Sequence, residues 1–232
     1  MPRLRFWKPA PGVRSFLIEL LIVVLGVLIA LGAQQTVDGW KTRREVAAFR
    51  AALNEELAGG LATYRFRIAQ GPCLRQRLKQ LDAWQRDWRD GTGPAWSGPI
   101  GRPLVANPQT AVWQTGALDT AGEMPLNIRL AYADLYDSLE NYRTLNFREV
   151  EAWYALFAYD AAMQMSEEEV NRLRGLILSA RWTDRSIELN YPRLLASAAV
   201  LGIRPAPVPA KDIADRLAAT QLCGPAEGAP AP

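Results

Sequence analysis

Few side chains in this sequence could do acid–base or nucleophilic chemistry. The chain contains no histidine, which excludes His-based triads, His general bases and His metal ligands. Its two cysteines, Cys73 and Cys223, form no CxxC pair, so zinc-ribbon and thioredoxin-type motifs are excluded too. A nucleophilic cysteine would lack a histidine base. We therefore expect no enzymatic activity, no cofactor and no metal site.

Carboxylate pairs are the remaining candidates for acid–base catalysis. Asp134, Asp137 and Glu140 follow one another at a helical turn's spacing, and Glu149 and Glu151 are close in sequence. Such pairs are typical of the solvated face of a helix. Without a pocket they support no paired-carboxylate mechanism, so we interpret all five as surface residues.

The strongest pattern in the chain is an apolar stretch near the N-terminus. Residues 13–33 contain only three polar side chains, Arg14, Ser15 and Glu19. A helix of about 21 residues spans the roughly 30 Å hydrocarbon layer of a bilayer. We predict a transmembrane helix over residues 13–35.

Two other interpretations of this stretch have to be weighed. Ala30 and Gly32 would suit a signal-peptidase site after Gly32, so a cleaved signal peptide stays an alternative. Against cleavage, Leu31 does not suit a cut after Ala33, and the helical pattern continues past Trp40. A buried core helix is disfavoured because basic residues flank one end.

The charge distribution predicts an orientation in the membrane. The chain has 27 Lys and Arg and 24 Asp and Glu; four bases but only one acid precede Gln35, which leaves 23 of each sign after it. The positive-inside rule therefore places the N-terminus in the cytoplasm and the body on the far side. The neutral body shows no excess of basic residues for nucleic acid. The four N-terminal bases are Arg3, Arg5, Lys8 and Arg14.

The predicted transmembrane helix carries a stripe of small residues with one acid. Small residues at helical spacing let another helix approach closely, and an intramembrane carboxylate is a functional hypothesis by default. We predict a helix–helix contact face here, with the bilayer and a second helix as partners; the alternative is that Glu19 simply reaches the interface. The predicted contact residues are Glu19, Val23, Gly26, Ala30 and Ala33.

The rest of the chain is predicted to be all-α. Apolar residues recur every three or four positions from Val46 to Ile68 and from Leu74 to Trp88. A long Tyr-rich helix is expected from Pro125 to Phe157, with a break near residues 144–147. A helix that opens at a Ser166 capping box is expected next.

Finer predictions concern glycine and proline positions. Gly59-Gly60 is expected to weaken or kink its helix, and Pro192 to bend or restart another. Asn107-Pro108 resembles an N-cap with proline at the first helical position. Residues 91–106 form a long Gly/Pro-rich loop, in which Trp96 and Leu104 are candidates for contact with a partner, or simply pin the loop to the bundle.

These patterns give a predicted domain organisation. Residues 1–12 form a short basic cytoplasmic tail, 13–35 a transmembrane helix, 36–222 a periplasmic helical domain and 223–232 a flexible tail. In an oxidising periplasm, Cys73 and Cys223 are expected to form a disulfide that ties the C-terminal segment to the second body helix.

The N-terminal pattern resembles a family of uncharacterised Gram-negative bacterial proteins, a domain of unknown function. The matching residues are Glu19 with Leu20 to Leu31, of the form E-x-L-x-V-V-x-G-V-L-I-A-L, followed by "VWQTGAL" (112–118) and "LAYADLYDSLENY" (130–142). The resemblance implies a basic tail, a membrane helix and an all-helical body in the bacterial inner membrane. It implies no activity.

Two functions are consistent with the sequence. The first is a non-enzymatic interaction or accessory subunit, bound to another envelope protein or to its own copies. The second is a small-molecule sensor or binding module, whose pocket between helices would be lined by aromatic residues that could equally form the core. These aromatics are Trp113, Tyr136, Tyr142 and Trp153.

Overall fold

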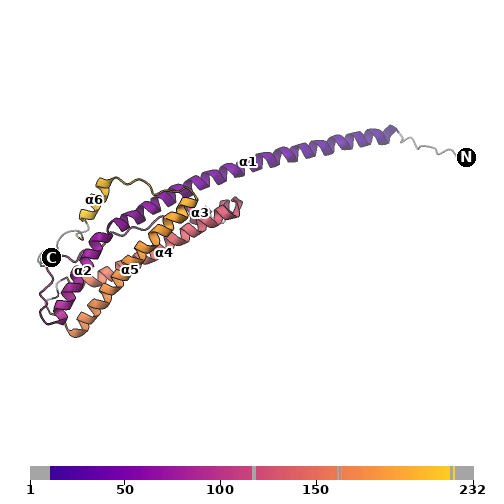
Figure 1. Cartoon of the computed structure of the whole chain (residues 1–232). Coiled ribbons are helices and arrows are strands. Elements are labelled where there is room, and N and C mark those ends of the chain that lie inside the picture. The colour runs from indigo at the N-terminus through magenta and orange to yellow at the C-terminus, as the bar shows by residue number, and fades with distance from the viewer. Residues whose placement is uncertain (1–10, 117–118, 161, 163, 220–221, 223–232) are drawn as a thin grey trace. The chain divides into compact units, whose positions relative to one another are not determined.

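The computed structural model describes residues 11–116, 119–160, 162, 164–219 and 222. Every regular element in these residues is a helix, which confirms the all-α prediction (Figure 1). The elements are α1 (Pro11–Ala69), α2 (Gly71–Arg89), α3 (Ala111–Gly116), the 3-10 helix η1 (Thr120–Glu123), α4 (Leu126–Phe157), α5 (Glu167–Val200) and α6 (Ala210–Ala219).

The chain divides into two compact units, Met1–Ala48 and Phe49–Pro232. The described part of the first unit is the N-terminal portion of α1. The second unit, called the body below, contains the rest of α1 and all later elements. Within the body, α1 buries Leu53, Leu57 and Leu61, as the apolar periodicity predicts.

Hydrogen bonds between helices define the topology of the body. Tyr132 bonds Asn54 and Glu149 bonds Arg67, so α4 runs parallel to this portion of α1. Helix α5 runs antiparallel to α1, because Tyr64 bonds Ile187 whereas Arg67, three residues later, bonds the earlier residue Asp184. Since α5 packs against both α2 and α4, the body is a helical bundle with α5 antiparallel to its neighbours.

A single residue separates α1 from α2. Gln70 caps α2 with helical dihedral angles, and Pro72 occupies the first turn, where its missing N–H costs no helical hydrogen bond. A Cβ on Gly71 would lie 2.8 Å from Glu188 Oε1. Glycine here therefore lets α5 approach the junction closely.

Residues 90–110 return along the bundle without helix or strand structure. Ile100 is fully buried and donates its N–H to Asp160 Oδ1 at 2.8 Å. Leu104 donates to and accepts from the Gln70 side-chain amide, both at 2.8 Å. The Gln70 amide thus bonds both the N–H and the C=O of Leu104, as a neighbouring β-strand would. These backbone groups would otherwise lack hydrogen-bond partners, because the segment has no secondary structure.

The helix ends are partly as predicted. Ser166 and Glu169 form the reciprocal capping box. Helix α5 ends in a Schellman motif, with Gly202 at φ +72° and the Ile203 N–H bonded to Ala198 O at 3.0 Å. The chain then returns to α1, where the Ala206 N–H donates to Ala58 O at 2.9 Å.

Several local predictions were wrong. Helix α4 is continuous through residues 144–147, because Leu145 and Asn146 are buried there and continue its packed face. Pro192 lies inside α5 and does not restart it, whereas a bend of the helix at Pro192 stays a prediction. Helix α3 begins at Ala111 rather than after Asn107-Pro108. Helix α1 continues through Gly59-Gly60, and a weakening or kink at these glycines stays a prediction.

Candidate functional site

The apolar part of α1 is the first candidate site. It is long and apolar enough to cross a membrane: its most apolar eighteen-residue window has a mean hydropathy of 2.8 and is 0% buried. In a soluble core helix, one face of such a window would be covered. This part of the chain therefore has the length and the uncovered apolar surface of a membrane span.

The predicted contact residues share one face of this helix. Their spacing of four, three, four and three residues places them along a single stripe, and all are exposed; they are Glu19, Val23, Gly26, Ala30 and Ala33. A Cβ built on Gly26 would meet nothing within 4 Å. The stripe is thus open to a second helix, and its role as a contact face stays a prediction.

The loop residues Trp96 and Leu104 pack inward rather than outward. Trp96 is half-buried against the core and meets Trp84 edge-on, with ring centroids 5.3 Å apart. Leu104 is half-buried and held through its backbone by Gln70. Both therefore pin the loop to the bundle, and a contact with a partner at these residues stays untested.

The four candidate pocket aromatics serve the bundle's packing. Trp153 is 1% exposed within the core cluster, and Tyr142 stacks on Tyr64 with centroids 3.8 Å apart. Trp113 stacks on Tyr136 at 5.0 Å. The four side chains are divided among these separate packing contacts.

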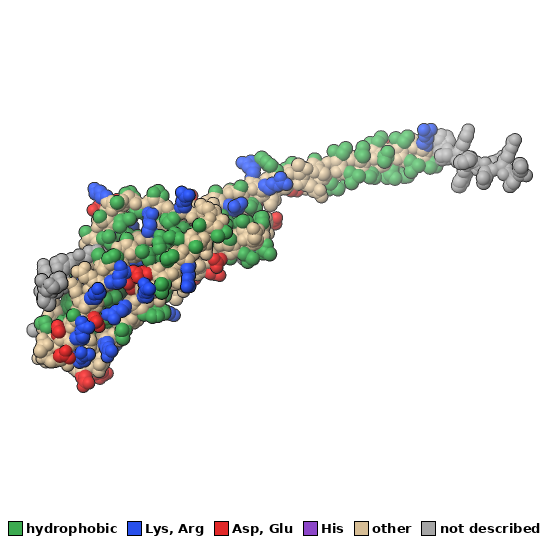
Figure 2. All heavy atoms as spheres, in the orientation of Figure 1, with side chains coloured by type: hydrophobic (Ala, Val, Ile, Leu, Met, Phe, Trp, Pro, Cys, Tyr) green, Lys and Arg blue, Asp and Glu red, His purple; other side chains and the backbone are tan. Residues whose placement is uncertain are grey.

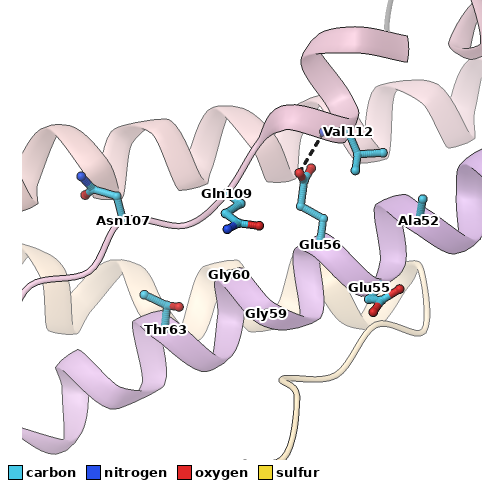
Figure 3. A pocket seen from close by; sticks show the side chains of 9 residues that line it. All are labelled: Ala52, Glu55, Glu56, Gly59, Gly60, Thr63, Asn107, Gln109 and Val112. Carbon is cyan, nitrogen blue, oxygen red and sulfur yellow. Dashed lines mark hydrogen bonds between the residues drawn. The ribbon is translucent and has the colours of Figure 1, made fainter. Parts of the chain in front are cut away.

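A groove does exist beside α1, at a place that the aromatic pattern does not indicate. It holds about 430 Å³ and is lined by polar and apolar surface in nearly equal measure. Figure 3 shows Thr63 and Glu55 along α1, with Gln109 on the facing segment. The lining residues are Ala52, Glu55, Glu56, Gly59, Gly60, Thr63, Asn107, Gln109 and Val112.

Glu56 joins the two walls of this groove. Its carboxylate accepts the backbone N–H groups of Val112, at 2.9 Å, and Trp113, at 3.4 Å, and so caps α3 from another helix (Figure 3). The same carboxylate accepts a hydrogen bond from the Tyr136 hydroxyl, with 2.6 Å between the two oxygens. Burial first, and then Glu56, raise the pKa of Tyr136 above its usual range. Glu56 is thus a structural clamp.

A buried charge cluster lies at the centre of the body. Arg67 is 1% exposed; its Nε donates to Glu149 Oε2 at 2.7 Å, and its Nη2 bonds both Glu149 Oε1 and Asp184 Oδ1, the latter at 2.8 Å. Burial alone would lower the pKa of Arg67, but the two carboxylates raise it above its ordinary value. This cluster joins α1, α4 and α5.

The interpretation of Glu149 as a solvated surface residue is therefore wrong. Glu149 is 0% exposed, whereas Glu151, two positions on, is exposed. A signal was present in the sequence, because each charged member of the cluster occupies a core-facing helical position. Glu149 lies between Leu145 and Trp153, at spacings of four. Charges on an apolar stripe indicate a buried pair.

The predicted disulfide involves a residue outside the described part of the chain, Cys223. Cys73 is half-buried and packs on the core cluster that contains Leu74 and Leu222. The two residues next to the cysteines in sequence therefore belong to one cluster. This arrangement is consistent with the bond, which stays a prediction.

The described residues contain no group of three or more His, Cys, Asp and Glu side chains that could hold a metal ion. Asp134, Asp137 and Glu140 are all exposed along α4, as expected for surface residues. No protein-family model, curated protein or solved structure matches the chain.

Proposed function

We propose that this protein is a single-pass membrane protein, with its N-terminus in the cytoplasm and its helical body in the bacterial periplasm. The observation that carries the proposal is the eighteen-residue apolar window of α1, none of which is buried. Exposing that much apolar surface to water would cost about 25 cal/mol per Å². A bilayer removes this cost, and the basic N-terminal tail favours this orientation.

We further propose that the body is a non-enzymatic interaction or accessory subunit. The buried charged cluster of Arg67, Glu149 and Asp184 is used within the core, where Arg67 pairs with both carboxylates, and it does not face a cleft. Glu56 is engaged as a clamp. The α1 stripe through Gly26, in contrast, is uncovered and suits close approach of a second helix.

The groove beside α1 supports a second candidate function, a small-molecule binding module. Its volume of about 430 Å³ lies in the range of ligand pockets, and its lining is about half polar, whereas such pockets are usually lined mostly by apolar groups. Gly59 leaves the α1 backbone uncovered, with nothing within 4 Å of a built Cβ. A small polar ligand would fit this chemistry.

One purification separates the two functions. The full chain is extracted in mild detergent from the cells that make it and is purified by a C-terminal tag. A stoichiometric protein partner, lost when Gly26 is replaced by Leu but kept when exposed Leu21 is replaced by Ile, supports the interaction subunit. The binding module is supported if the protein purifies as a monomer without a partner and a small-molecule extract raises its thermal stability. That stabilisation should be absent when Gly59 is replaced by Trp.

A further inference from the structure

A strip of basic residues lies where α2 and α5 meet on the surface of the body, and it is called the basic seam below. Figure 2 shows Lys and Arg side chains gathered over this part of the body, with fewer acidic ones among them. The structure brings basic residues of α2 beside arginines of α5. The seam consists of Arg75, Arg86, Arg181 and Arg185, which the ion pairs below place at this junction, together with Lys79 and Arg174, which helical spacing places on the same faces.

Two carboxylates lie within the seam, and arginines from both helices share each of them. Asp82 pairs with Arg86 at 3.3 Å and with Arg181 at 3.7 Å. Glu188 pairs with Arg75 and, at 3.8 Å, with Arg185. Six positive charges thus face two negative ones, and a surplus of positive charge stays exposed to solvent.

Exposed apolar side chains border the seam on the outer face of α5, and Trp182 among them also lines a groove with Arg148 and Glu151 of α4. Leu178, Trp182 and Leu189 are 49%, 57% and 52% exposed. Together with Arg185 they follow the four, three, four spacing of a single helical stripe. Exposed Trp and Arg side by side are the residue types that dominate binding energy at protein interfaces.

We propose that the basic seam is the docking surface for an acidic amphipathic helix of another protein. Two antiparallel helices present a groove in which a third helix packs. Carboxylates of that helix would accept from the surplus guanidinium groups, which suit bidentate pairing. Its apolar side chains would cover Trp182 and Leu178. The seam extends along α2 from Arg75 to Arg86, about 16 Å or three helical turns.

This inference rests on the proposed interaction function and names its surface and the partner's chemistry. It is tested in intact cells with a photo-crosslinking phenylalanine analogue at Trp182, in the full chain. The same analogue at Leu130, an exposed α4 residue outside the seam, is the position control. The adduct's peptide is then identified by mass spectrometry.

The charge of the seam is tested with a second pair of variants. Lys79→Glu with Arg174→Glu reverses two exposed seam charges that take part in none of the ion pairs described above. The matched control, Arg204→Glu with Lys211→Glu, reverses one exposed arginine and one exposed lysine outside the seam. Equal thermal stability of the two double variants shows that both fold.

The proposal predicts an adduct from Trp182 on an acidic, apolar helical segment of another protein. That adduct falls by about tenfold or more in the seam variant, since like charges oppose docking, and is unchanged in the control. An adduct on lipid or on a second copy of this chain, an unchanged adduct in the seam variant, or no adduct overturns the proposal. If wild type and seam variant purify with the same partner, the seam inference fails while the interaction function stands.

Discussion

Arg67 provides the sharpest test of how the body is held together. Its side chain is 1% exposed and is bonded to Glu149 and Asp184, which are 0% and 3% exposed. Arg67→Met keeps much of the apolar length but removes the charge. Two buried carboxylates then lose the guanidinium that neutralises them and donates hydrogen bonds to them.

The expected loss follows from these contacts. Removing one partner of a buried ion pair costs about 3–5 kcal/mol, because the remaining charge stays desolvated. That is a large share of the roughly 5–15 kcal/mol by which domains are stable. The triple variant Arg67→Met, Glu149→Leu, Asp184→Leu removes all three charges at once. Replacing a buried charge cluster by apolar residues is about neutral or stabilising by up to about 4 kcal/mol.

The assay is urea unfolding of the full chain in detergent micelles, followed by tryptophan fluorescence. Trp153 lies in the core and reports on the body. We expect Arg67→Met to unfold at much lower urea than wild type, and the triple variant to recover most or all of the loss. A single-variant loss below about 1 kcal/mol, or a triple variant less stable than the single one, would refute this account of the cluster.

Three further predictions use features elsewhere in the body. Gly59→Ala should stabilise the body by about 0.5–1 kcal/mol in the same urea assay, because the added Cβ at residue 59 would meet nothing within 4 Å. Gly60→Ala should stabilise it less or destabilise it, because the added Cβ at residue 60 would lie 3.1 Å from the Cβ of Pro108. Burial raises the pKa of Tyr142 to about 12. The neutral Tyr142 side chain therefore contributes fully to the free energy of unfolding below pH ~10, and about 2–3 kcal/mol of that free energy is lost as the pH rises towards 12. In Tyr142→Phe the free energy of unfolding should fall less over this pH range. Thiol alkylation of denatured protein should label Cys73 and Cys223 only after reduction, and labelling without reductant would argue against the disulfide.

The helices themselves were largely predictable from local sequence. The apolar stripe of α2, from Leu74 through Leu78 and Leu81, is buried as its spacing indicates. The Ser166 capping box opens α5 as expected. These features depend on residues within a turn or two of one another, where periodicity and capping are informative.

Features that depend on distant residues were not predicted. Pro192 stays within α5 although local rules favour a break there. The N-terminus of α3 is capped by Glu56, which lies far earlier in the chain. The partner of Glu149 is Arg67, 82 residues away. Sequence spacing along one helix carries no information about which distant helix completes such a contact.

The membrane anchor and the location of the body are tested most directly by protease protection. Spheroplasts of cells that make the tagged full chain are treated with protease from outside, and the membrane pellet is then extracted at alkaline pH. We predict that the body is digested in unbroken spheroplasts and that undigested protein stays in the pellet with its first residues intact. Digestion only after the inner membrane is broken, or a mature chain lacking the residues up to Gly32, would contradict the account.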